Sequence, residues 1–201
     1  SNATISDSEA ILTITDDEAL GFVWTASDIA TTADGAEDVY IADIDGDGDL
    51  DIVSASLNDD TIAWYENDGA INPSFSAANI ITNADAAEAV YIVDIDADGD
   101  LDIVGASAND DSIFWLEHNG GADPTFTKVV IATSADEASK VVVADMDGDG
   151  DLDIVSSSRA DDTIAWYEND GAANPTFTAV DIATSADGAQ DVKVADIDGD
   201  G

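Results

Sequence analysis

Short apolar segments alternate along the chain with acidic, glycine-containing segments. In the first clear unit, residues alternate within each segment, so that Ile62 and Trp64 fall on one face and Ala63 and Tyr65 on the other. This two-residue period, without a sustained helical stripe, predicts β-strands. Turn residues such as those at 67–69 separate the segments. The four strands expected in this unit are Val39–Ala42, Leu50–Ser54, Thr61–Tyr65 and Phe75–Thr82.

The pattern returns at intervals of 51 residues, as shown by Trp64, Trp115 and Trp166. Residues 38–88, 89–139 and 140–190 form three full copies. Trp24 lies one period before Phe75, so we interpret residues 4–37 as the back part of a worn copy. Residues 191–201 begin a further copy, and residues 1–3 resemble the remnant of a cleaved tag.

Four short strands in a repeat of about 40–50 residues are typical of a β-propeller blade. The sequence therefore predicts an all-β propeller domain with four-stranded antiparallel blades, about four of them in this chain. A solenoid of stacked sheets is the less favoured alternative, because solenoid repeats are usually shorter.

Composition narrows the possible partners. The chain has 46 acidic and 4 basic residues, a formal charge of −42, and no cysteine. Such a charge disfavours nucleic acid and anionic membrane surfaces, and no apolar run is long enough for membrane insertion. The 45% hydrophobic content and the periodic aromatic residues still predict a packed core.

An acidic loop of nine residues follows the first strand of each full copy, with the spacing D-x-D-x-D-G-x-x-D. Carboxylates at positions 1, 3, 5 and 9 and a backbone carbonyl at position 7 are the oxygen ligands that calcium prefers, and the glycine at position 6 permits a sharp turn. The predicted metal residues are Asp43, Asp45, Asp47, Asp49 and Asp51; Asp94, Asp96, Asp98, Asp100 and Asp102; and Asp145, Asp147, Asp149, Asp151 and Asp153.

We expect about three structural Ca²⁺ ions, one in each complete loop. A fourth, incomplete loop contains Asp196, Asp198 and Asp200, and lacks positions 7 and 9. An EF-hand does not fit, because that loop needs a glutamate at position 12, where this chain has Ser54, Gly105 or Ser156.

Residues 42–53 and 61–69, with their copies, resemble the FG-GAP and VCBS-type repeats of bacterial surface and secreted proteins, which are related to the integrin α-subunit propeller. The resemblance implies a calcium-binding propeller that is extracellular or on the cell surface and that acts in adhesion or in binding a protein or carbohydrate ligand. Related propellers also occur in polysaccharide lyases, so an accessory or catalytic part of a polysaccharide-active enzyme is the alternative. A literal Phe-Gly or Gly-Ala-Pro is missing, which weakens transfer of integrin-like recognition.

The residues themselves favour binding over catalysis, and we predict that the chain is not an enzyme. His118 replaces the Asn67 and Asn169 of the other copies, so a turn substitution is favoured over a general base. The repeated tryptophans are interpreted as packing between blades, with sugar stacking as the alternative. Loops that vary between copies, such as the one containing Arg159, are the better candidates for ligand contacts.

The last acidic loop is incomplete at Gly201, which suggests a piece of a longer propeller. Terminal blades would then expose unpaired edges. One hypothesis is a homodimer that completes an eight-bladed propeller, and a self-closed ring of four blades is the rival.

Overall fold

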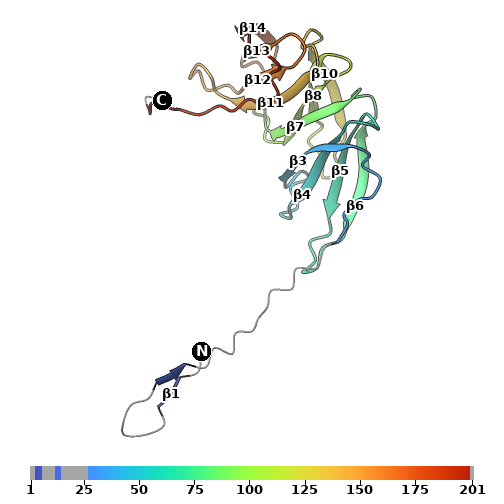
Figure 1. The fold of residues 1–201 in the computed structure, drawn as a ribbon. Helices are drawn as coiled ribbons and strands as arrows, with labels where there is room; N and C mark the ends of the chain where they lie inside the picture. The colour runs from blue at the N-terminus through green and yellow to red at the C-terminus, as the bar shows by residue number, and fades with distance from the viewer. Residues whose placement is uncertain (1–2, 6–11, 15–26, 200–201) are drawn as a thin grey trace.

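A computed structural model describes residues 3–5, 12–14 and 27–199 of the chain (Figure 1). Three four-stranded antiparallel sheets follow one another in chain order, and we call them blades 1, 2 and 3. Blade 1 contains β3 (Ala36–Ala42), β4 (Asp51–Ser56), β5 (Thr61–Asn67) and β6 (Phe75–Ile81). Blade 2 contains β7 (Ala87–Val93), β8 (Asp102–Ser107), β9 (Ser112–His118) and β10 (Phe126–Ala132). Blade 3 contains β11 (Ala138–Ala144), β12 (Asp153–Ser158), β13 (Thr163–Asn169) and β14 (Phe177–Ala183).

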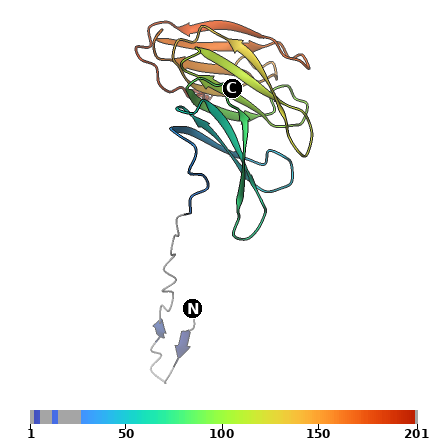
Figure 2. The same ribbon diagram turned by 90° about the vertical axis from the view of Figure 1, so that its right-hand side faces the viewer.

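In every blade the strands pair in sequence order, and no strand crosses over another. The first strands lie beside one another, because β7 contacts β3 and β4 while β11 contacts β7 and β8. Figures 1 and 2 show the three sheets stacked face to face along an arc. The fold is therefore an incomplete β-propeller, as the strand pattern predicts. The first strand of each blade begins earlier than expected, because a bulge near Asp38 and its equivalents extends the pairing.

The segments outside the three blades carry less regular structure. A separate hairpin joins β1 (Ala3–Ile5) to β2 (Leu12–Ile14), and residues 27–35 form no strand. Residues 184–199, where a further repeat should begin, also contain no strand. Trp24, on which the assignment of the worn copy depends, lies outside the described residues.

Two apolar cores lie between the blades. Trp64 packs against blade 2 with Val90, Ile92 and Leu116, and Trp115 packs against blade 3 with Val141 and Ile154. Trp64 and Trp115 are buried, which confirms that these two rings pack between blades. Trp166 is only half-buried, because no complete blade covers it in the described structure.

Cations also join the blades. Arg159 of blade 3 forms an ion pair with Glu88 of blade 2, and Lys140 of blade 3 lies 2.6 Å from Asp38 of blade 1. Lys128 of blade 2 donates to the carbonyl of Asn83 and lies over the ring of Phe114. These cations are thus part of the blade contacts, and Arg159 is not the free ligand-binding group that its variable loop suggests.

Hydrogen bonds from backbone N–H groups to aspartate carboxylates also recur at the connections between blades. Asp60 has a φ of +57°, and its carboxylate accepts the N–H of Ala86 just before β7. Asp111 does the same for Glu137 before β11, and Asp162 does the same for Gly188. The third bond places Gly188, after β14, in the position that Ala86 and Glu137 occupy just before the first strand of the next blade.

Blade 2 differs from its neighbours by a coordinated exchange of side chains. Blade 1 pairs Ser54 with Ala63, and the Ser54 hydroxyl lies 3.2 Å from that of Tyr65. Blade 2 has Gly105 opposite Phe114 and replaces the tyrosine by Leu116. A Cβ atom on Gly105 would lie 2.4 Å from Cζ of Phe114, so the glycine provides the space for the phenyl ring.

Gly105→Ser should therefore destabilise the chain by about 1–3 kcal/mol, because it forces Phe114 out of its position. The triple variant Gly105→Ser/Phe114→Ala/Leu116→Tyr recreates the blade 1 arrangement and should recover most of this loss. Thermal melts of the two variants and the parent test the point. A Gly105→Ser melt equal to the parent, or a triple variant that melts lower still, would contradict it.

Candidate metal centres

The three complete acidic loops connect the first and second strands of their blades. Two residues in each loop have left-handed backbone angles. Position 6 is Gly48, Gly99 or Gly150, with φ between +98° and +103°. Position 4 is also left-handed, and Ala97 has a φ of +59° there. Glycine is therefore favoured at position 4 because the backbone has a positive φ there. Ala97 in the second loop makes this requirement hard to predict from the sequence.

Backbone N–H groups hold the loop carboxylates in place. Oδ2 of Asp43 accepts the N–H of Gly48, and Oδ1 of Asp45 accepts that of Asp47. The equivalent bonds recur in the second and third loops. Each loop is thus a set of tight turns in which side-chain oxygens replace backbone acceptors.

These turns bring carboxylates together. In each of three groups, one oxygen atom from every member lies within 4.8 Å of the others. The groups are Asp43, Asp45 and Asp47; Asp94, Asp96 and Asp102; and Asp145, Asp147 and Asp153. The structure therefore assembles part of each predicted ligand set, with position 5 in the first loop and position 9 in the other two.

The aspartate at position 9 has a second role. Asp51 is 1% exposed; its Oδ2 accepts the N–H of Ile44 at 3.2 Å and its Oδ1 accepts that of Asn67 at 2.8 Å. Asp102 and Asp153 make the same two bonds. One buried carboxylate therefore fastens the start of the loop to the end of the third strand.

The other predicted ligands contribute less to the three groups. Asp98 and Asp149 each accept a backbone N–H two residues ahead. The Asp49 carboxylate packs against Gly69, where an added Cβ would meet it at 2.2 Å. Asp100 and Asp151 face Gly120 and Gly171 in the same way. Among the described residues, the fourth loop forms no such group; Asp196 accepts the N–H of Gly199, and Asp200 lies outside the described range.

Burial and mutual repulsion raise the pKa values of several loop carboxyls. Burial is the main cause for Asp45, Asp96 and Asp151, and the negative charges of their loop neighbours add to it. Burial raises the pKa of Asp102 to about 7, although the N–H groups of His118 and Ile95 oppose the shift. Without a cation, the loops hold carboxylates that resist ionisation.

A side chain at the end of the third strand was missed as part of this centre. Asn169 donates to the carbonyls of Ile95 and Leu152, and so joins the loops of blades 2 and 3. Its Oδ1 accepts the N–H of Gly171. His118 occupies the same position, and its Nδ1 accepts the N–H of Gly120 at 2.9 Å. The signal was present in the recurrence of an asparagine or histidine two residues before a glycine.

His118 is buried at 4% exposure and lies at the end of a strand. Because Nδ1 is an acceptor, the proton of the neutral ring is on Nε2. That atom has no hydrogen-bond partner within the described part of the chain. The ring therefore replaces the asparagine as a support for the turn, as its place in the repeat indicates.

Comparison with known proteins identifies the repeat. The FG-GAP-like repeat family matches residues 43–105, 94–156 and 145–201. The chain belongs to this family. Its matches begin at the first aspartate of each complete acidic loop; because they overlap, the first two each contain two complete loops and the third contains one.

Among solved structures, the chain is similar to a lectin from Agrocybe aegerita, described as recognising non-reducing terminal N-acetylglucosamine. The TM-score is 0.51 at 23% identity, and the match covers 77% of this chain and 41% of the lectin chain. This likeness concerns the fold, and the matched region is less than half of the lectin. No curated protein matches the chain. Across the described ranges, we find no helix suited to crossing a membrane.

The pKa of Asp102 predicts an unusual pH dependence in chelator-containing buffer. Its value of about 7 exceeds the ordinary 3.8, so the folded state binds more protons than the unfolded state between these limits. The melting temperature should therefore rise by several degrees as the pH falls from 8 to 5. Asp45, Asp96 and Asp151 shift in the same direction.

Asp102→Asn should flatten this pH dependence, because the amide does not titrate. Asp68→Asn is the control, since hydrogen bonds from Ser74 lower the pKa of Asp68 and place its titration below this window. A parent melting temperature that falls steadily toward pH 5 in chelator would contradict the assignment.

Proposed function

We propose that this chain is an extracellular, calcium-stabilised β-propeller that binds ligands without transforming them. The observation that carries the proposal is the convergence of carboxylates in three equivalent loops, each tied to the blade by a buried aspartate. Membership of the FG-GAP-like family supports a binding scaffold.

The chemistry of the loops fits calcium. Every donor is a carboxylate or carbonyl oxygen, and several carboxylates in a flexible loop favour Ca²⁺ over Zn²⁺ or Mg²⁺. Asp43 also has a buried Oδ1 without a hydrogen-bond partner among the described residues, which is the kind of atom that a cation would satisfy. The carboxylates of the three groups would hold the ions.

A bound calcium ion would supply positive charge to each loop and take no part in covalent chemistry. The loops already turn through backbone hydrogen bonds, so the chain positions the ligands and the ion removes their repulsion. Extracellular calcium is commonly millimolar, and extracellular modules typically bind it with dissociation constants of about 10⁻⁴–10⁻³ M. The location rests on the FG-GAP-like repeats, which are typical of extracellular proteins.

The ligand-binding surface that we favour is the cleft between the loops of blades 1 and 2. It is lined by Asp43, Asp45, Asp100, His118 and Gly121 among others. His118 Nε2 provides a buried donor without a partner in the described structure, and a carbohydrate hydroxyl group beside it would accept its hydrogen bond. The −42 charge favours an uncharged glycan over an anionic one.

Calcium should raise the thermal stability of the chain by mass action, since only the folded loops assemble the ligands. At 100 times the dissociation constant, one site adds about 2.7 kcal/mol. We expect a lower melting temperature in EGTA, full recovery with excess Ca²⁺ and weaker recovery with Mg²⁺.

Asp45→Asn should reduce the calcium-dependent part of this shift by about one third, because two complete loops remain. Asp181→Asn is the matched control, since Asp181 is exposed on the outer strand of blade 3. Equal melts in EGTA and Ca²⁺ would remove the basis for calcium.

Ligand binding is tested on an array of neutral and acidic glycans in the presence of Ca²⁺. We expect retention of neutral glycans that is lost in EGTA. His118→Asn converts the cleft to the arrangement of blade 3 and should weaken binding about tenfold while leaving the melting temperature within a few degrees. Binding that is unchanged by His118→Asn would exclude this cleft, and an empty array would exclude the carbohydrate class.

A further inference from the structure

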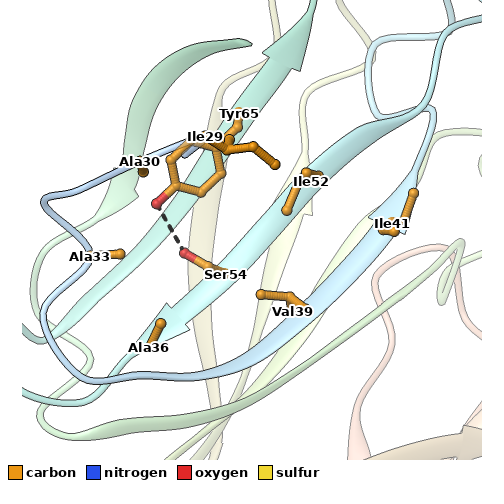
Figure 3. A pocket seen from close by; sticks show the side chains of 9 residues that line it. All are labelled: Ile29, Ala30, Ala33, Ala36, Val39, Ile41, Ile52, Ser54 and Tyr65. Carbon is orange, nitrogen blue, oxygen red and sulfur yellow. Dashed lines mark hydrogen bonds between the residues drawn. The ribbon is translucent and has the colours of Figure 1, made fainter. Parts of the chain in front are cut away.

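Blade 1 has an exposed apolar face, whereas the equivalent face of blade 2 is buried against blade 1. Val39 and Ile41 are each 58% exposed, whereas their equivalents Val90 and Ile92 are 1% and 5% exposed beneath blade 1. Figure 3 shows the resulting pocket, with Val39, Ile41 and Ile52 beside the hydrogen-bonded pair Ser54 and Tyr65. Ile29 and Ala33 cover one side of it.

Ile29 and Ala33 correspond in the repeat to Ile80 and Ala84, which pack from blade 1 onto blade 2. The segment 27–33 thus takes the place of the outer edge of a preceding blade. In the described structure, no strand fills this pocket in the way that β5, with Ile62 and Trp64, covers blade 2.

The opposite end of the stack has the complementary feature. Ala186 donates its N–H to the carbonyl of Asp162, and the Ser139 hydroxyl donates to the carbonyl of Ala189. Residues 186–194 therefore follow blade 3 as the first strand of a further blade would. Val192 and Val194 match Val141 and Val143 of β11, yet no strand pairs with them in the described residues.

The β1–β2 hairpin has the strands with which residues 186–194 could pair. In the 51-residue repeat, the residues of β1 correspond to residues of β4, and those of β2 correspond to residues of β5. Ala3 corresponds to Ser54 but pairs with Ile14, the equivalent of Tyr65, whereas Ser54 pairs with Ala63; the two registers therefore differ by two residues. The hairpin therefore corresponds to the second and third strands of a blade, and in the described structure its sheet has two strands only. Two-stranded sheets are marginally stable, and their edges favour addition of a strand.

We propose that residues 189–195 of one chain add to the free edge of β1 in a second copy of this chain, so that the two copies build a blade together. The repeat sets the register: Asp38 pairs with Ala55 and Val39 with Ser54 in blade 1, so Asp191 should pair with Thr4 and Val192 with Ala3 of the second copy. The shared blade then covers the apolar face of blade 1 in that second copy.

A second copy fits better than closure within one chain. The apolar face of blade 1 and the unpaired segment on blade 3 lie at opposite ends of the arc (Figures 1 and 2), although the Lys140–Asp38 ion pair joins the first strands of these two blades. Two copies related by a two-fold axis bring each free segment to the free edge of the other, and both contacts are then identical.

Disulfide trapping tests the contact, because the natural chain has no cysteine. Directly opposed residues on antiparallel strands lie about 4.5–5.5 Å apart between Cα atoms, which suits a disulfide. Thr4→Cys and Asp191→Cys chains are denatured, mixed, refolded in millimolar Ca²⁺ and oxidised. Random assortment places about half of the protein in mixed pairs, and we expect this half to form a disulfide-linked pair containing one chain of each variant.

The control mixes Asp191→Cys with Ile71→Cys, whose side chain is fully exposed in the β5–β6 loop and should give little cross-link. Light scattering of the parent chain should give twice 20.7 kDa. A single-chain mass in Ca²⁺, or an internal disulfide in a monomeric Thr4→Cys/Asp191→Cys double variant, overturns the proposal. Circular dichroism of each variant confirms that it has folded before oxidation.

Discussion

The structure depends on the buried aspartate at the end of each acidic loop. Asp51, Asp102 and Asp153 are each 1% exposed, and each accepts backbone N–H groups from the start of its loop and from the end of the third strand. A carboxylate in this position ties three strands of the blade together, but its burial disfavours the charge. The cation that the neighbouring carboxylates would hold offsets that cost.

The same conflict between charge and packing recurs between the blades. In a chain of formal charge −42, two of the four basic residues form ion pairs between different blades, and Lys128 bonds to the segment that connects blades 1 and 2. The apolar cores around Trp64 and Trp115 then exclude water between the sheets. Acidic loops gather at the connections of first and second strands, where a cation can reach them, while cations of the chain itself serve the blade contacts.

The repeat made most of the fold predictable from the sequence. The alternation of residues 61–65 and the recurrence of Trp64 indicated the strands, the faces and the packing of the tryptophans. Three features could not be predicted from the repeat. The bonds of Asn169 to two loops join groups up to 74 residues apart, the exchange of Gly105 and Phe114 requires the cross-strand register, and the ion pairs of Arg159 require the order of the blades. Each depends on contacts between repeats, which a single period does not contain.

The central claim is that each complete loop holds one structural calcium ion. Equilibrium dialysis of the chain against millimolar calcium, followed by elemental analysis, counts these ions directly. The account predicts about three bound ions per chain, and none in the same chain dialysed against excess chelator. A count near zero in calcium, with the protein folded, would contradict it.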